Sequence, residues 1–144
     1  MLKARLDQFE LNLTNRARPD LIEVCGLCLM FFEFADSEYV RRVQKREKNS
    51  ASWAEYTLNE AYLTCEGLSV HEIRQICGRL SSRISTSVCL KRVRSTFLLL
   101  SSTDSWATAK FRFWACRSVS DEKEFQFFED WKGEDELLLV KHNC

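Results

Sequence analysis

Cations and a tryptophan alternate along residues 106–119 at the spacing of a β-strand. Because side chains at every second position of a strand share a face, we expect Lys110, Arg112 and Trp114 to project together. Lysine and arginine neutralise phosphates, and an exposed aromatic ring stacks on an unpaired base. The segment therefore predicts a surface that binds RNA or single-stranded DNA.

Two preceding segments carry further cations. Arg79 and Arg83 lie one turn apart on the polar side of a helix predicted over about residues 70–84. Three more cations belong to the strand that we predict after this helix. If the helix and both strands face the same way, they form a groove suited to single-stranded or structured RNA. The predicted nucleic-acid site consists of Arg79, Arg83, Lys91, Arg92, Arg94, Lys110, Arg112 and Trp114.

The distribution of charge supports a binding surface but leaves the partner open. Residues 69–118 carry nine Lys/Arg and two acids, a net charge of +7. Residues 119–144 carry three lysines and eight acids, a net charge of −5, and residues 1–68 carry nine cations and eleven acids, a net charge of −2. The alternative function is therefore a protein–protein interaction regulator or a homo-oligomer in which basic and acidic segments pair. The acidic tail can also pair with the cations within one chain.

A second basic run lies at residues 41–48. Cations near the end of a helix complement the negative end of its macrodipole, which explains this run as part of a solvated helix end. A nuclear-import or anion-binding patch is the alternative interpretation.

Seven cysteines are scattered along the chain, and Cys25-Gly26-Leu27-Cys28 is its one CxxC motif. Both of these cysteines lie in an apolar run, and the remaining cysteines and histidines lack the spacing of a second pair of zinc ligands. We therefore expect the two cysteines to pack in the core. A small zinc-binding protein is a third, weaker hypothesis. The odd cysteine count and the absence of an apolar leader predict reduced thiols and an intracellular protein, cytoplasmic with the nucleus as the alternative.

Catalytic and cofactor motifs are absent from the sequence. The two histidines, His71 and His142, have no paired acid or nucleophile motif, and there is no glycine-rich phosphate loop. We therefore expect a non-enzymatic binding protein without a cofactor. The longest apolar stretch, residues 21–35, is too short to span a bilayer and is interrupted by Glu23 and Glu33, so no membrane partner is expected. The composition, rich in Cys, Trp, Phe, Ser and Arg, resembles that of accessory proteins of viruses and other mobile elements.

These residues must be positioned by a mixed α+β fold, which we expect to be a single domain over residues 1–144. One proline and four glycines favour long elements and few tight turns. The patterns predict helices over about residues 20–48, 53–66 and 70–84. A small antiparallel sheet should follow, with strands over about residues 88–100, 106–118 and 136–141.

The helix over residues 70–84 has the clearest local signal. Ser69 and Glu72 form a capping box, and Leu68 and Ile73 occupy the positions of a hydrophobic staple. Apolar residues then recur at helical spacing as far as Ile84. The acidic, aromatic-rich C-terminal element, residues 119–144, is expected to dock its aromatic side chains into the core of the domain.

Overall fold

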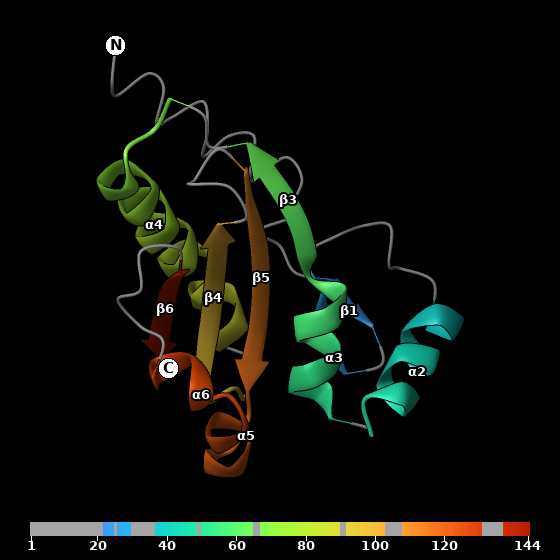
Figure 1. Cartoon of the computed structure of the whole chain (residues 1–144). Helices are drawn as coiled ribbons and strands as arrows, with labels where there is room; N and C mark the ends of the chain where they lie inside the picture. The colour runs from blue at the N-terminus through green and yellow to red at the C-terminus, as the bar shows by residue number, and fades with distance from the viewer. Residues whose placement is uncertain are drawn as a thin grey trace.

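The predicted α+β class is confirmed by a computed structural model of the chain, shown in Figure 1. The structure describes residues 22–24, 26–29, 37–48, 50–64, 67–89, 92–102, 108–130 and 137–144. Within these residues, a four-stranded antiparallel sheet has helices on both of its faces, and a short two-stranded hairpin packs beside it.

The sheet has the strand order β3-β5-β4-β6. β4 (Ser95–Ser102) and β5 (Thr108–Cys116) form the predicted hairpin, with Phe97 opposite Trp114. β6 (Leu137–Asn143) confirms the predicted last strand and pairs with β4. The first of the predicted strands begins later than expected, because the helix before it extends to Val88.

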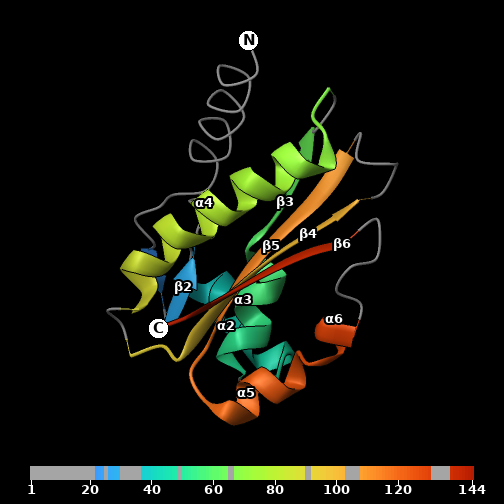
Figure 2. The ribbon, with the colours of Figure 1, turned by 90° about the vertical axis from the view of Figure 1, so that its left-hand side faces the viewer.

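Helix α4 (Val70–Val88) confirms the helix predicted from the capping box. The Ser69 hydroxyl accepts a hydrogen bond from the backbone N–H of Glu72, and the Glu72 carboxylate accepts one from the N–H of Ser69. Its apolar stripe, including Ile73, packs on one face of the sheet against side chains such as Phe111 and Phe113. Figure 2 shows α4 lying across this face.

The opposite face of the sheet is covered by α3 (Ala51–Leu58), α5 (Val119–Glu124) and α6 (Phe127–Asp130). Phe125 and Phe128, from the acidic C-terminal element, are buried against Trp114 and Phe97 of the sheet. The expected docking of tail aromatics into the core is therefore confirmed for these two side chains. Phe127 is 37% exposed, and Trp131 lies outside the described residues.

The long helix predicted over about residues 20–48 is wrong in its first half. β1 (Ile22–Val24) and β2 (Leu27–Leu29) form an antiparallel hairpin there, and a separate helix, α2 (Ser37–Arg46), follows. Gly26 turns the chain with a φ of 79°, a left-handed conformation that glycine adopts without steric cost. A nearly continuous apolar run fits a buried strand as well as a buried helix, which is why periodicity alone misassigned it.

The helix predicted over about residues 53–66 is correct only in its first half. α3 (Ala51–Leu58) ends at Asn59, and β3 (Glu60–Thr64) continues the chain as an edge strand beside β5. The Asn59 side-chain amide donates to the carbonyls of Cys28 and Phe113, which fixes the point where helix becomes strand. Glu60, which falls within the range predicted as helix, instead lies opposite Arg112 in the sheet.

Candidate nucleic-acid interface

The predicted basic site is divided between the two faces of the sheet. Arg79 and Arg83 are exposed on α4, which covers one face. Lys110, Arg112 and Trp114 alternate with the side chains that contact α4, so they point to the opposite face. The condition for a common groove, that the three basic elements face the same way, is therefore not met by the described residues.

Trp114 is not available to stack on a base. It is fully buried, with its ring stacked on Phe97 at a centroid distance of 5.3 Å. Tyr56 and Phe125 contact the same ring at 5.2 and 4.9 Å. The role predicted for Trp114 is wrong, because the strand pattern shows which residues share a face but not whether that face is covered.

Lys110 and Arg112 bind an acid of the neighbouring strand. Glu60 lies 3.6 Å from the Lys110 Nζ and 2.6 Å from the Arg112 Nη2. The Arg112 guanidinium also donates to the carbonyl of Tyr56 at 2.6 Å and lies 4.2 Å from the centroid of the Tyr56 ring. Only 14% of the Arg112 side chain is exposed, so its charge serves mainly to join β5 to β3 and α3.

The remaining predicted cations lie before β4. Arg94 pairs with Glu122 of α5, and Glu122 also binds the Lys141 ammonium at 2.8 Å. Desolvation of Glu122 opposes ionisation, but hydrogen bonds from Lys141 and Arg94 outweigh it and hold the pKa of this carboxyl below its ordinary value. The acidic tail thus acts as an intramolecular counterion at this point. Arg92 is exposed, and Lys91 lies outside the described residues.

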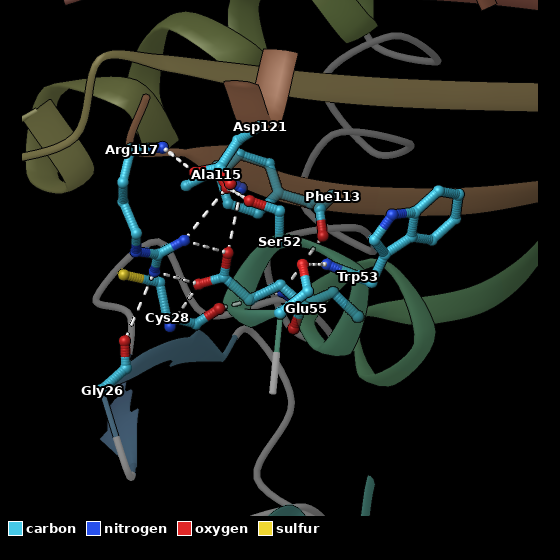
Figure 3. Close-up of polar contacts among 11 residues, drawn as sticks. Gly26, Cys28, Ser52, Trp53, Glu55, Phe113, Ala115, Arg117 and Asp121 are labelled. Atoms are coloured by element: carbon cyan, nitrogen blue, oxygen red, sulfur yellow. Dashed lines mark hydrogen bonds and ion pairs between the residues drawn. The ribbon is translucent and has the colours of Figure 1, made fainter. Parts of the chain in front are cut away.

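A buried polar cluster that the sequence analysis missed is drawn in Figure 3. Glu55 of α3 is fully buried and binds the guanidinium of Arg117 through both carboxylate oxygens, each at 2.8 Å. The backbone N–H groups of Cys28 and Ala115 donate to the same carboxylate at 2.6 and 3.1 Å. Burial would lower the pKa of Arg117, but the hydrogen bonds and charge of Glu55 outweigh it and raise this pKa above its ordinary value.

This cluster joins three elements that are distant in the sequence. Glu55 belongs to α3, Cys28 to β2, and Ala115 to β5, while Arg117 also reaches the carbonyl of Gly26 at 3.4 Å. Both carboxylate oxygens are engaged, and the Glu55 side chain is fully buried. The arrangement therefore fixes the β1–β2 hairpin against α3 and β5, and it does not present the Glu55 carboxylate to a substrate as a general base. The sequence carries no signal for it, because the partners of Glu55 lie 27 to 62 positions away along the chain.

The cysteines are only partly as predicted. Cys89 and Cys144 form a disulfide, so the prediction of reduced thiols is wrong for this pair. Cys28, in β2 rather than in a helix, is buried, as are Cys77 and Cys116. Burial is the main cause that raises the pKa of the Cys116 thiol to about 12. No three His, Cys, Asp or Glu side chains gather as metal ligands among the residues that the structure describes.

Helix α2 presents the densest group of exposed cations in the described chain. It buries Val40 and Val43 against α3 and β2. Its solvent side carries four neighbouring cations, and a fifth follows the helix. These residues, named here the α2 patch, are Arg41, Arg42, Lys45, Arg46 and Lys48.

A cavity of about 440 Å³ lies at the C-terminal end of α2. Its described lining residues are Arg46, Glu47, Lys48, Ser50, Trp53 and Glu124, and we call it the Trp53 cavity. Trp53 is half-buried, and its indole N–H donates to the Glu124 carboxylate at 2.8 Å. Phe125 packs on the Trp53 ring at a centroid distance of 4.3 Å, so the indole is held in place at the edge of the patch.

No protein-family model, curated protein or solved structure matches this chain. Among the helices of the described segments, none is long and apolar enough to cross a lipid bilayer.

Proposed function

We propose that the protein is a non-enzymatic, intracellular binding protein, cytoplasmic or nuclear, that binds single-stranded RNA or DNA through the α2 patch and the Trp53 cavity. The observation that carries this proposal is the placement of four exposed cations on one side of α2, next to a half-buried indole. The class of ligand is the one expected from the sequence, whereas the residues that bind it are different.

The charge of α2 favours a polyanion. Residues 37–48 contain five cations and two acids, Glu38 and Glu47, which gives a net charge of +3. Within the described residues, the ion pair between Arg46 and Glu47 is weak, with 3.9 Å between the Arg46 Nε and the Glu47 carboxylate and 66% of the Arg46 side chain exposed. By contrast, Lys110, Arg112 and Arg94 each pair with an acid of the same domain. Exposed cations on a rigid helix can bind successive phosphates with little reorganisation.

The Trp53 cavity supplies what base binding needs. Its volume falls within the range of small-molecule pockets, and its wall combines an indole with cations and carboxylates. A base that enters can contact the Trp53 ring while its phosphate stays on Arg46 or Lys48. The carboxylates of Glu47 and Glu124 can accept hydrogen bonds from the amino groups of a base.

Fluorescence anisotropy with a labelled single-stranded RNA tests the proposal. With about four phosphate contacts, the logarithm of the association constant should fall with the logarithm of salt concentration at a slope of about −2.8. Removing three cations in R41Q/R42Q/K45Q should weaken binding about tenfold or more at low salt and reduce this slope by about 2 units.

The matched control removes three exposed cations from α4, in R74Q/R79Q/R83Q, and should leave the affinity near that of the unaltered protein. Equal weakening by the two triple variants, or binding that is insensitive to salt, would contradict the assignment to α2. Trp53 fluorescence gives an independent readout, because the quenching caused by RNA should be smaller in Trp53→Phe than in the unaltered protein.

The alternative, a protein–protein regulator or homo-oligomer held by pairing of basic and acidic segments, remains a hypothesis. Pairing of Glu122 with Arg94 and Lys141 within the chain satisfies part of that charge without a second subunit. Sedimentation at low and high salt tests this alternative: a salt-sensitive dimer that binds no RNA would favour it over the proposal.

A further inference from the structure

A second cavity, of about 480 Å³, lies beside the disulfide. Cys89 is the C-cap residue of α4, and Cys144 follows β6, so the bond joins the end of the helix to the end of the strand. Cys144 is exposed and lines this cavity, whereas Cys89 is half-buried. Cys144 is therefore the more accessible end of the disulfide.

Three arginines and no acidic side chain occur among the described residues that line this cavity. These residues are Arg92, Val93, Arg94, Arg117, Asn143 and Cys144. The acids that pair with Arg94 and Arg117 are Glu122 and Glu55, and neither is part of the cavity wall. Since Glu122 and Glu55 compensate the charges of Arg94 and Arg117, the anion preference of the cavity depends on the third arginine, Arg92.

Arg92 is the cation most open to a ligand. It is exposed and makes no ion pair or hydrogen bond with any residue that the structure describes. Its φ of 59° lies in the left-handed region, which is costly for a residue with a Cβ and recurs at binding sites. The neighbouring backbone is fixed, because Arg94 N–H donates to the Cys116 carbonyl and Cys144 N–H donates to the Arg94 carbonyl. The chain thus holds Arg92 and Cys144 at the same cavity.

We propose that this cavity binds a small anionic thiol and that the Cys89–Cys144 disulfide undergoes thiol–disulfide exchange with it. The thiolate sulfur attacks the Sγ of Cys144, a new S–S bond forms, and the bond to Cys89 breaks. Cys89 leaves as a thiolate and takes a proton from water. A second thiolate then attacks the bound thiol's sulfur, which releases Cys144 and a small-molecule disulfide. Two electrons have passed from two thiols to the protein.

Arg92 acts by binding a carboxylate of the incoming thiol and by stabilising the negative charge on sulfur during exchange. Such a disulfide responds to the thiol pool of its surroundings. In a reducing compartment it would open and release the covalent link between α4 and β6, which reconciles the observed disulfide with the proposed intracellular location. This site shares no residue with the α2 patch or the Trp53 cavity, so either proposal can fail without the other.

Reduction of the native protein by two thiols of opposite charge tests the inference. Glutathione carries carboxylates, whereas cysteamine is cationic. The rate of disulfide reduction is measured by acid quenching and peptide mass spectrometry of Cys89 and Cys144, and it is divided by the thiolate concentration of each reagent. We expect glutathione to react about tenfold faster, which is the low end of electrostatic rate enhancements. Arg92→Gln should bring the two rates close together, Arg92→Lys should retain most of the difference, and Arg74→Gln, on α4, is the matched control.

Equal rates for the two thiols in the unaltered protein would overturn the proposal. So would a preference for glutathione that is the same in Arg92→Gln as in Arg74→Gln, or a disulfide that resists millimolar glutathione in the native state. Circular dichroism and thermal melts of each variant establish that the comparison concerns folded protein.

Discussion

Replacing Glu55 by glutamine should destabilise the fold by about 3–5 kcal/mol, which is the usual cost of breaking a buried ion pair by removing one partner. Each carboxylate oxygen accepts one guanidinium N–H and one backbone N–H: Oε1 from Arg117 and Ala115, and Oε2 from Arg117 and Cys28. Either orientation of the glutamine amide therefore points its NH₂ group at two donors. Rotating the side chain cannot relieve the mismatch.

The magnitude follows from burial. Glu55 is fully buried, so water cannot replace the lost acceptor for the backbone N–H, and water reaches the Arg117 guanidinium only over the 27% of that side chain that is exposed. An unsatisfied buried N–H alone costs about 1–3 kcal/mol, and the unpaired guanidinium adds to this. The pair of Arg46 and Glu47, 3.9 Å apart with 66% of the Arg46 side chain exposed, provides the control, since Glu47→Gln should change stability by less than about 1 kcal/mol.

Urea unfolding of Glu55→Gln, Arg117→Gln and the double variant measures the effect. The double-mutant cycle should give a coupling energy of about 2 kcal/mol, because Arg117→Gln leaves the carboxylate of Glu55 fully buried without its partner and Glu55→Gln leaves a partly buried guanidinium unpaired. Hydrogen exchange at the amides of Cys28 and Ala115 should lose protection in Glu55→Gln. A loss below about 1 kcal/mol with unchanged protection at both amides would refute the role assigned to this cluster.

Three further predictions concern single groups. Because the pKa of Glu122 is held below its ordinary value of 4.5, its contribution to stability is complete above that pH and is lost as the pH falls through the lowered value. The stability of Glu122→Gln between pH 6 and pH 2, about the range in which carboxyls titrate, should therefore depend less on pH than that of the unaltered protein. An identical pH dependence would contradict the pairing with Arg94 and Lys141. Ser69→Ala removes the capping hydroxyl of α4 and should cost about 1 kcal/mol in urea unfolding, whereas Ser82→Ala, at an exposed position on the same helix, should cost less. The Cys116 thiol is buried and its pKa is raised to about 12, so it should resist alkylation by iodoacetamide at pH 8 until the protein unfolds. Peptide mapping measures the extent of labelling. Rapid labelling of Cys116 in the native protein would contradict its burial.

Elements with local signals were the ones that the sequence predicted well. The capping box at Ser69 and Glu72 involves residues three positions apart, and the apolar period of α4 spans neighbouring turns. The β4–β5 hairpin also joins adjacent segments, and the alternation along β5 identified correctly which side chains share a face. Each of these signals is complete within a short stretch of chain, so it can be read without knowing the rest of the fold.

The elements predicted wrongly depend on contacts with distant residues. The hairpin of β1 and β2 lies in an apolar run whose periodicity fits helix or strand, and its packing on α2 and α3 decides between them. The transition at Asn59 depends on hydrogen bonds to Cys28 and Phe113, 31 and 54 residues away. Likewise, the disulfide links cysteines 55 residues apart, a pairing that no spacing rule specifies.

For the candidate site, the sequence shows which cations and aromatic rings are present and on which local elements they lie. Which of these side chains stay open to a ligand depends on the packing of the whole chain. Trp114 is buried because α3, α5 and α6 cover its face, and Lys110 and Arg112 share the carboxylate of Glu60, on a strand distant in sequence. The run at residues 41–48, interpreted first as a helix end, became the exposed α2 patch. Exposure and charge pairing depend on how several elements pack together, whereas sequence periodicity describes the faces of one helix or strand at a time.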